Sequence, residues 1–168
     1  MKVLLIDMLV PYPPSDGAKL RVFNLLRHIS NYCDVSLLAL RKPAADEDGI
    51  ADYLRSFCSH VEFVGRPTLT LREYRLQQLK GLLRRETVRS ATDYSEQMAS
   101  RIRALTENEA FDVVDIQRPG MAPYVRAISP DSHCRKILTL YDVPYVQYRR
   151  MMSVKRGWRA KCLSLIHI

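Results

Sequence analysis

Short, uninterrupted apolar runs recur along the first part of the chain, and amphipathic segments separate them. The runs lie within residues 2–7, 35–40 and 61–64. A strand that is apolar at successive positions has both faces buried, as in a parallel sheet covered by helices. The intervening segments, 17–30 and 46–58, carry apolar residues at helical spacing. This alternation predicts an α/β fold built on an open, Rossmann-like parallel sheet.

The rest of the chain extends the same pattern. Two further apolar runs, 111–116 and 135–141, predict a fourth and a fifth strand. Helical patterns are expected in four more segments, which are 69–85, 93–106, 120–128 and the residues after Pro144. The 168 residues suit one domain with one core. We therefore expect one sheet of about five strands with helices on both faces.

The composition is that of a basic cytosolic protein. The net charge of +8 favours anionic partners such as phosphates, nucleic acid or acidic lipid headgroups, although solubility alone also explains it. Asp7 interrupts the apolar start of the chain, which favours a buried strand over a signal peptide. The four cysteines and four histidines have no metal-ligand spacing. Free thiols and no metal site are therefore expected.

Ligands of open α/β sheets bind at the carboxyl ends of the strands, near the point where the strand order reverses. The Pro-rich loop after the first strand should lie there, and it ends in Asp16 and Gly17 at the start of a helix. Free N–H groups at a helix start, beside a glycine that lets a ligand approach, can hold a phosphate or a sugar hydroxyl. The alternative is that Asp16 only caps the helix and Gly17 eases a turn. One glycine is too few for a dinucleotide-binding fingerprint.

Polar residues also follow the fourth and fifth predicted strands. Gln117 and Arg118 are expected to form hydrogen bonds and to contact an anion in the crevice, with a solvated loop as the alternative. Tyr141 and Asp142 close the fifth strand, where a carboxylate can hold a sugar hydroxyl or transfer a proton. Asp142 is therefore the candidate catalytic residue. The alternative is that Asp142 caps a helix ahead of Pro144.

Leucines and basic residues share the predicted helix 69–85. A basic amphipathic helix can lie on an anionic membrane surface. A helix that packs on the core and extends its arginines to solvent fits the same pattern. Peripheral contact with a membrane is therefore one of two interpretations of this segment.

Four blocks of the sequence, in order, resemble the N-terminal domain of GT-B glycosyltransferases in the large retaining group called family four. The most specific block joins the first strand to its loop and helix, through residue 21, and the others are 34–40, 111–117 and 137–144. The resemblance extends to about Trp158. It implies a two-domain cytoplasmic enzyme that transfers a sugar from a nucleotide-sugar donor to a glycan or lipid-linked acceptor. Such enzymes often act at the inner membrane face, and they need no metal ion or other cofactor.

The resemblance also implies roles for individual residues. Asp16 and Gly17 would line the region of the donor phosphate and sugar, and Arg21 would support their loop. Gln117 and Asp142 would face the reacting sugar. Many relatives have a histidine where this chain has Tyr141, so the role of that histidine does not transfer.

The domain organisation follows from the same resemblance. The family's C-terminal domain, with its nucleotide pocket and acidic pair, has no counterpart in this sequence. Residues 1–162 are therefore expected to be the acceptor-side half of the enzyme, inactive alone. Residues 163–168 back-translate to a transposon-end sequencing adapter, and we expect them not to belong to the natural protein. The alternative is a genuine short apolar terminus.

A second function class remains open on the sequence alone. The basic surface also suits a standalone α/β module that binds an anionic ligand, nucleic acid or a membrane surface. Nucleic-acid modules usually interleave basic residues with exposed aromatic residues. The nine tyrosines form no such stripe, so no nucleic-acid partner is expected.

Overall fold

The structure is a computed structural model, and it describes residues 1–41, 48–66, 70–73, 76 and 94–141. Its centre is a sheet of five strands, all parallel, in the order β3-β2-β1-β4-β5. The strands are β1 (Lys2–Asp7), β2 (Asp34–Arg41), β3 (His60–Gly65), β4 (Val113–Gln117) and β5 (Arg135–Thr139). This arrangement confirms the predicted Rossmann-like α/β class.

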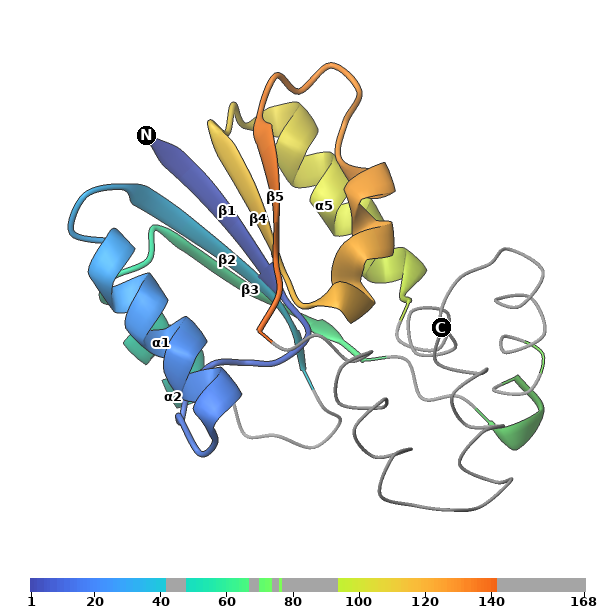
Figure 1. Ribbon diagram of the computed structural model, residues 1–168, viewed down its shortest axis with the longest axis horizontal. Coiled ribbons are helices and arrows are strands. Elements are labelled where there is room, and N and C mark those ends of the chain that lie inside the picture. The colour runs from blue at the N-terminus through green and yellow to red at the C-terminus, as the bar shows by residue number, and fades with distance from the viewer. Residues whose placement is uncertain (42–47, 67–69, 74–75, 77–93, 142–168) are drawn as a thin grey trace, which may run out of the picture.

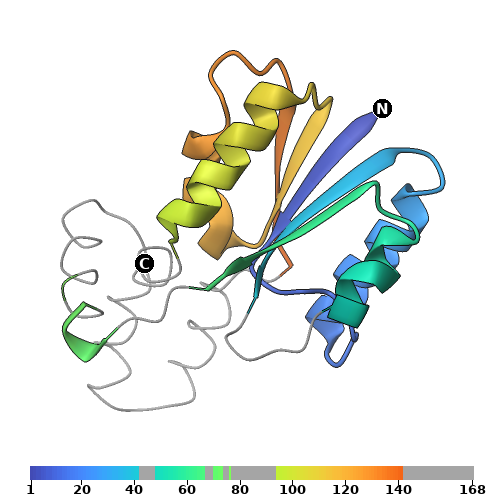
Figure 2. The same ribbon diagram turned by 180° about the vertical axis from the view of Figure 1, so that it is seen from behind.

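Helices cover both faces of the sheet, as predicted (Figures 1 and 2). On one face lie α1 (Gly17–Ile29) and α2 (Asp48–Arg55). On the other face lie α5 (Glu96–Asn108) and the 3-10 helix η1 (Pro119–Ala127). Within the part of the chain that the structure describes, no helix is long and apolar enough to cross a membrane.

The contiguous apolar runs fill two layers of core, one on each side of the sheet. Alternate residues of a strand point to opposite faces. Leu4 and Ile6 therefore pack under α5 and η1, while Leu5 packs under α1 and α2. All three of these side chains are fully buried. The apolar character of successive residues in β1 is thus explained by burial on both faces.

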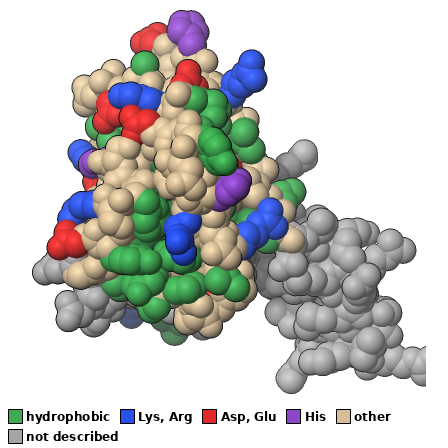
Figure 3. All heavy atoms as spheres, turned by 90° about the vertical axis from the view of Figure 1, so that its left-hand side faces the viewer, with side chains coloured by type: hydrophobic (Ala, Val, Ile, Leu, Met, Phe, Trp, Pro, Cys, Tyr) green, Lys and Arg blue, Asp and Glu red, His purple; other side chains and the backbone are tan. Residues whose placement is uncertain are grey.

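Helix α2 contributes one aromatic side chain, Tyr53, to the surface beside α1. Tyr53 lies 4.5 Å from the ring of Tyr12 and 6.2 Å from the ring of Phe23, measured between ring centroids. Figure 3 shows a group of hydrophobic side chains on this side of the molecule, bordered by basic residues. Tyr53 itself is 41% exposed, so part of the aromatic cluster faces solvent.

Several element boundaries differ from the sequence-based predictions. The fourth strand was predicted at 111–116 but begins at Val113, where its pairing with Val3 of β1 begins. The fifth was predicted to reach Tyr141 but ends at Thr139, opposite Gln117 at the end of β4. Tyr141 therefore belongs to the loop after β5 and not to the strand.

The predicted helices also need adjustment. The segment predicted at 120–128 is a 3-10 helix, and Pro123 inside it has no N–H for an α-helical hydrogen bond. The helix predicted at 93–106 begins at Glu96, because the Ser95 side chain accepts a hydrogen bond from the Met98 N–H and caps it. The helix predicted at 46–58 is shorter, at Asp48–Arg55. Most of 69–85, and everything after residue 141, lies outside the described residues.

Candidate functional site

A buried ion pair joins the carboxyl end of β1 to the residue after β4. The Asp7 side chain is fully buried, and its Oδ1 accepts a hydrogen bond from the Arg118 guanidinium at 2.8 Å. The same oxygen accepts the Met8 N–H at 2.7 Å. Burial raises the pKa of Asp7, while the hydrogen bond and charge of Arg118 oppose that rise. The Arg118 side chain is 15% exposed, so the pair lies just beneath the surface at this end of the sheet.

The backbone of Arg118 adopts an unusual conformation. Its φ is 79° and its ψ is 144°, in a region that costs about 1–3 kcal/mol for a residue with a Cβ atom. The Arg118 N–H donates to the Thr139 carbonyl at 2.8 Å, which ties the turn to the end of β5. Residues held in such conformations cluster at functional sites, where the surrounding structure maintains them. The turn aims the guanidinium back across the sheet toward β1.

A second set of polar side chains forms a continuous hydrogen-bonded chain across β4 and β5. The Asp115 carboxylate accepts the Thr139 hydroxyl at 2.8 Å and the Gln117 Nε2 at 2.6 Å. The Gln117 Oε1 in turn accepts the Tyr141 hydroxyl. Gln117 is fully buried, so its amide makes these bonds away from water. Four side chains are thereby linked in a fixed order.

The strand geometry explains why these side chains meet. Asp115 and Gln117 are two residues apart on β4, so they point to the same face of the sheet. Gln117 pairs with Thr139 across the β4–β5 ladder. Burial raises the pKa of Asp115, while its two hydrogen bonds and the nearby charge of Arg21 oppose the rise.

Two arginines lie over one tyrosine ring. The Arg21 guanidinium carbon is 4.6 Å from the centroid of the Tyr141 ring, and that of Arg118 is 5.4 Å away. Both distances are in the range of cation–π attraction. Burial and the charge of Asp7 raise the pKa of Tyr141, so its phenol stays protonated at neutral pH. Arg21 is exposed, and among the described residues its guanidinium has no hydrogen bond or ion pair.

The start of α1 lies at the same end of the sheet. Asp16 Oδ1 accepts the N–H groups of Ala18 at 3.0 Å and Lys19 at 2.9 Å, which confirms it as the N-cap. These bonds, the one from Lys19 above all, lower the pKa of Asp16, and the charge of Arg118 lowers it further. A Cβ atom at Gly17 would meet nothing within 4 Å. Packing therefore does not require a glycine at this position.

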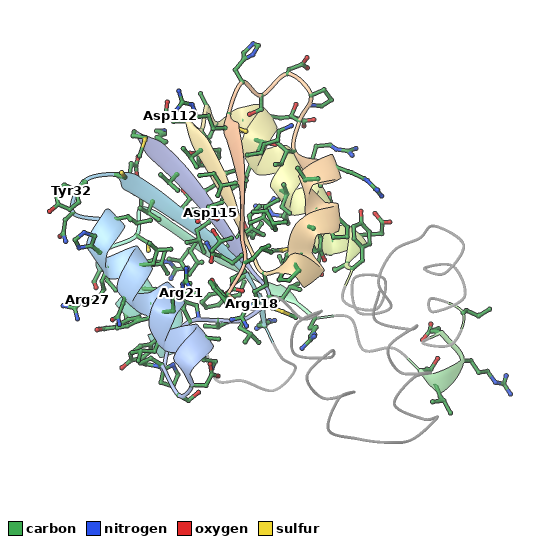
Figure 4. The ribbon with its side chains drawn as sticks, viewed as in Figure 1. Arg21, Arg27, Tyr32, Asp112, Asp115 and Arg118 are labelled. Carbon is green, nitrogen blue, oxygen red and sulfur yellow. The ribbon has the colours of Figure 1, made fainter. Side chains whose placement is uncertain are left out.

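The structure brings together most of the residues predicted from the sequence. Arg21, Gln117, Arg118 and Tyr141 form one cluster, and Asp16 with Gly17 lies beside it at the start of α1. Figure 4 shows Arg21 and Arg118 near the carboxyl ends of the strands and Asp115 in the middle of β4, with Arg27, Tyr32 and Asp112 placed away from them. Asp142 lies outside the described residues, so its catalytic role stays a prediction.

Three members of the cluster were missed by the sequence analysis, namely Asp7, Asp115 and Thr139. Two of them could have been found from the sequence, because Asp7 is a charge at the end of the first apolar run and Asp115 is a charge inside the fourth. A buried polar side chain inside an apolar strand needs a partner, and that need marks it as a site candidate. The identity of each partner depends on strand register, which the sequence did not provide.

A depression in the surface lies at the opposite, amino ends of the strands. It is an open depression of about 1150 Å³, and Phe111, Asp112 and His133 are among its lining residues. It contains none of the residues of the polar cluster. Among the described residues, no group of three His, Cys, Asp or Glu side chains could hold a metal ion. Open α/β sheets bind ligands at the carboxyl ends of their strands where the strand order reverses, so the polar cluster is the stronger candidate site.

No protein-family model matches the chain, and neither does any curated protein. Among solved structures, the chain is similar to Arabidopsis thaliana UGT89C1 complexed with UDP, with a TM-score of 0.39 and 14% sequence identity. The similarity covers 93% of this chain and 37% of that one. The chain thus spans little more than a third of the length of this neighbour. The α/β class itself follows from the five parallel strands.

Proposed function

We propose that the chain is the acceptor-side domain of a GT-B glycosyltransferase. In this proposal the whole enzyme transfers a sugar from a nucleotide-sugar donor to a glycan or lipid-linked acceptor, without a metal ion. The observation that carries the proposal is the polar cluster at the carboxyl ends of β1, β4 and β5. The strand order reverses between β1 and β4, and open α/β sheets bind ligands at that point. The opening strand, loop and helix, which resemble those of family four, add support.

The cluster offers the chemistry that a sugar phosphate needs. Arg21 can give its N–H groups to anionic phosphate oxygens. At the start of α1 the Gly17 N–H adds a backbone donor, because the Asp16 side chain accepts only those of Ala18 and Lys19. Tyr141 lies under Arg21 and offers its phenol oxygen to a sugar hydroxyl. The ion pair between Asp7 and Arg118 joins the carboxyl end of β1 to the turn after β4 beneath this cluster.

The proposed reaction is a group transfer between two oxygens. The bond between the anomeric carbon of the donor sugar and its phosphate oxygen breaks, and the acceptor oxygen forms a new bond to that carbon. The nucleoside diphosphate leaves, and its released oxygen takes up the proton that the acceptor hydroxyl loses. In this proposal a second domain supplies the nucleotide pocket. Asp142 is the candidate catalytic residue and faces the reacting sugar. Action at the inner membrane face belongs to the same proposal.

Binding of nucleotide sugars to the full chain tests this proposal. We expect UDP-glucose or GDP-mannose to bind weakly, as measured by saturation-transfer NMR and a titration of affinity. Arg21→Gln should weaken the binding about tenfold, because a hydrogen bond to a charged group contributes about 1.5–3 kcal/mol. Arg27→Gln is the matched control, since it removes the same group from the same helix away from the cluster.

Two results would count against the proposal. Equal weakening by Arg21→Gln and Arg27→Gln would show that only the basic surface attracts the anion, as a general anion-binding module would. Tight binding of random-sequence oligonucleotides, with nucleotide sugars not binding, would replace the proposed enzyme domain by a nucleic-acid module.

A further inference from the structure

We infer that Asp115 fixes the hydrogen-bonding direction of Tyr141, so that the Tyr141 oxygen accepts a hydrogen bond from a ligand hydroxyl. This inference rests on the proposed function and deepens it. It assigns a specificity-determining role to Tyr141 and a positioning role to Asp115.

The Asp115 carboxylate receives hydrogen bonds on both of its oxygens. The Thr139 hydroxyl lies 2.8 Å from Oδ1, and the Gln117 Nε2 lies 2.6 Å from Oδ2. An ionised carboxylate has acceptors only, so each partner must turn a donor toward it. Asp115 therefore determines which end of the Gln117 amide faces it.

The Gln117 amide links Asp115 to Tyr141. Its NH₂ group faces Asp115, so its carbonyl oxygen must face the other way, toward Tyr141. Gln117 is fully buried, and turning its amide would leave a donor or an acceptor without a partner in the dry interior. Such a loss costs about 1–3 kcal/mol, which is enough to keep one orientation.

The Tyr141 hydroxyl is the end of this hydrogen-bonded chain. Tyr141 has one hydroxyl proton, and it donates that proton to Gln117. Only the lone pairs of its oxygen remain for a ligand. A ligand group at this position must therefore be a donor, such as a sugar hydroxyl, and a keto, deoxy or fluoro group would lose the bond. Arg21, directly over the same ring, offers donors only, so it suits an anionic oxygen. The two neighbours together select a hydroxyl beside a phosphate.

The test uses methyl glucoside and its four monodeoxyfluoro analogues, because fluorine cannot donate a hydrogen bond. We expect one analogue to bind the full chain about fivefold to tenfold more weakly than the parent sugar, the equivalent of about one hydrogen bond. Tyr141→Phe should abolish this discrimination. Tyr32→Phe, a change at an exposed tyrosine in the turn after α1, should keep it.

Asp115→Asn tests the positioning role. The new amide can donate to Gln117, so Gln117 can turn and leave the Tyr141 proton free for the ligand. Discrimination against the fluoro analogue should fall below about twofold, the equivalent of less than half a hydrogen bond. The Gln117 side-chain NH₂ resonances should also shift in the absence of ligand. Asp112→Asn, at the opposite end of the same sheet, should leave both properties as in the wild type.

If the glycosides bind but the fluoro analogues bind as well as the parent, the inference is wrong and the proposed function stands. If Asp115→Asn folds and keeps the wild-type discrimination, Asp115 does not set the direction. If Asp115→Asn fails to fold, the comparison of Tyr141→Phe with Tyr32→Phe decides the role of the phenol. If nucleotide sugars bind but no methyl glucoside does, the inference is wrong and the proposed function stands. If neither kind of ligand binds, both fail.

Discussion

Replacing Arg118 with alanine is expected to lower the free energy of unfolding by about 3 kcal/mol at pH 7, because removing one partner leaves a buried charge uncompensated. The remaining partner is Asp7, which is fully buried and bonded to the Arg118 guanidinium at 2.8 Å. Urea unfolding followed by circular dichroism would measure the change. Arg27→Ala is the control, and we expect less than about 0.5 kcal/mol for this surface change.

The decrease in the free energy of unfolding caused by Arg118→Ala should depend on pH in a defined direction. Burial already raises the pKa of Asp7 in the folded state, and Arg118 opposes that rise. Without Arg118 the folded-state pKa rises further above the ordinary value of 3.8. A carboxyl with a raised folded-state pKa stabilises the fold when it is protonated, and that stability is lost as pH increases through this pKa. The stability deficit of the variant should therefore shrink as pH falls from neutral toward the ordinary value, and an equal deficit at all pH values would refute the explanation.

A glycine at the same position separates the ion pair from the backbone. Arg118→Gly also removes the guanidinium, but glycine tolerates the φ of 79° without the cost of a Cβ atom. We expect Arg118→Gly to be more stable than Arg118→Ala by about 1 kcal/mol, after allowance for the greater freedom of glycine in the unfolded chain. Equal or lower stability of the glycine variant would mean that the turn is not strained.

The second large effect is expected in the core beneath α1. Leu5→Ala should lower the free energy of unfolding by about 3 kcal/mol, because it removes buried methyl groups and leaves a cavity. Leu5 is fully buried on the face that α1 covers, and its Cα pairs with those of Leu37 and Asp115. Thermal or urea unfolding measures the change directly.

A matched truncation on the surface provides the control for Leu5→Ala. Leu20 lies on α1 and is 46% exposed. Leu20→Ala should cost less than about 1 kcal/mol, because much of the side chain is already in water. If the two substitutions lowered the free energy of unfolding equally, the packing of α1 against this face of the sheet would be wrong.

The fold was predictable because the local patterns agree with the tertiary structure. Contiguous apolar residues marked the strands, and Asp16 marked the start of the first helix. The exact ends of the strands were not predictable, because pairing decides them. Tyr141 looked like part of an apolar strand, yet the β4–β5 ladder ends two residues earlier, at Thr139.

The site was predictable only in outline. The rule that ligands meet the carboxyl ends of parallel strands pointed to Gln117, Arg118 and Tyr141. The rule says nothing about which side chains bond to one another. The roles of Asp7 and Asp115 depend on contacts with residues that lie 111 and 24 positions away in the sequence. Contacts of that range come from register and from the left-handed turn at Arg118, which no local pattern indicated.

The central claim is that ligands bind at the carboxyl ends of the strands. A ¹H–¹⁵N NMR titration of the full chain with a nucleotide sugar tests it most directly. We predict that the shifted resonances gather at Gly17, Arg21, Gln117 and Tyr141, at the carboxyl ends of the strands. Shifts gathered around Asp112 and the depression at the amino ends, or shifts at neither edge, would contradict the claim.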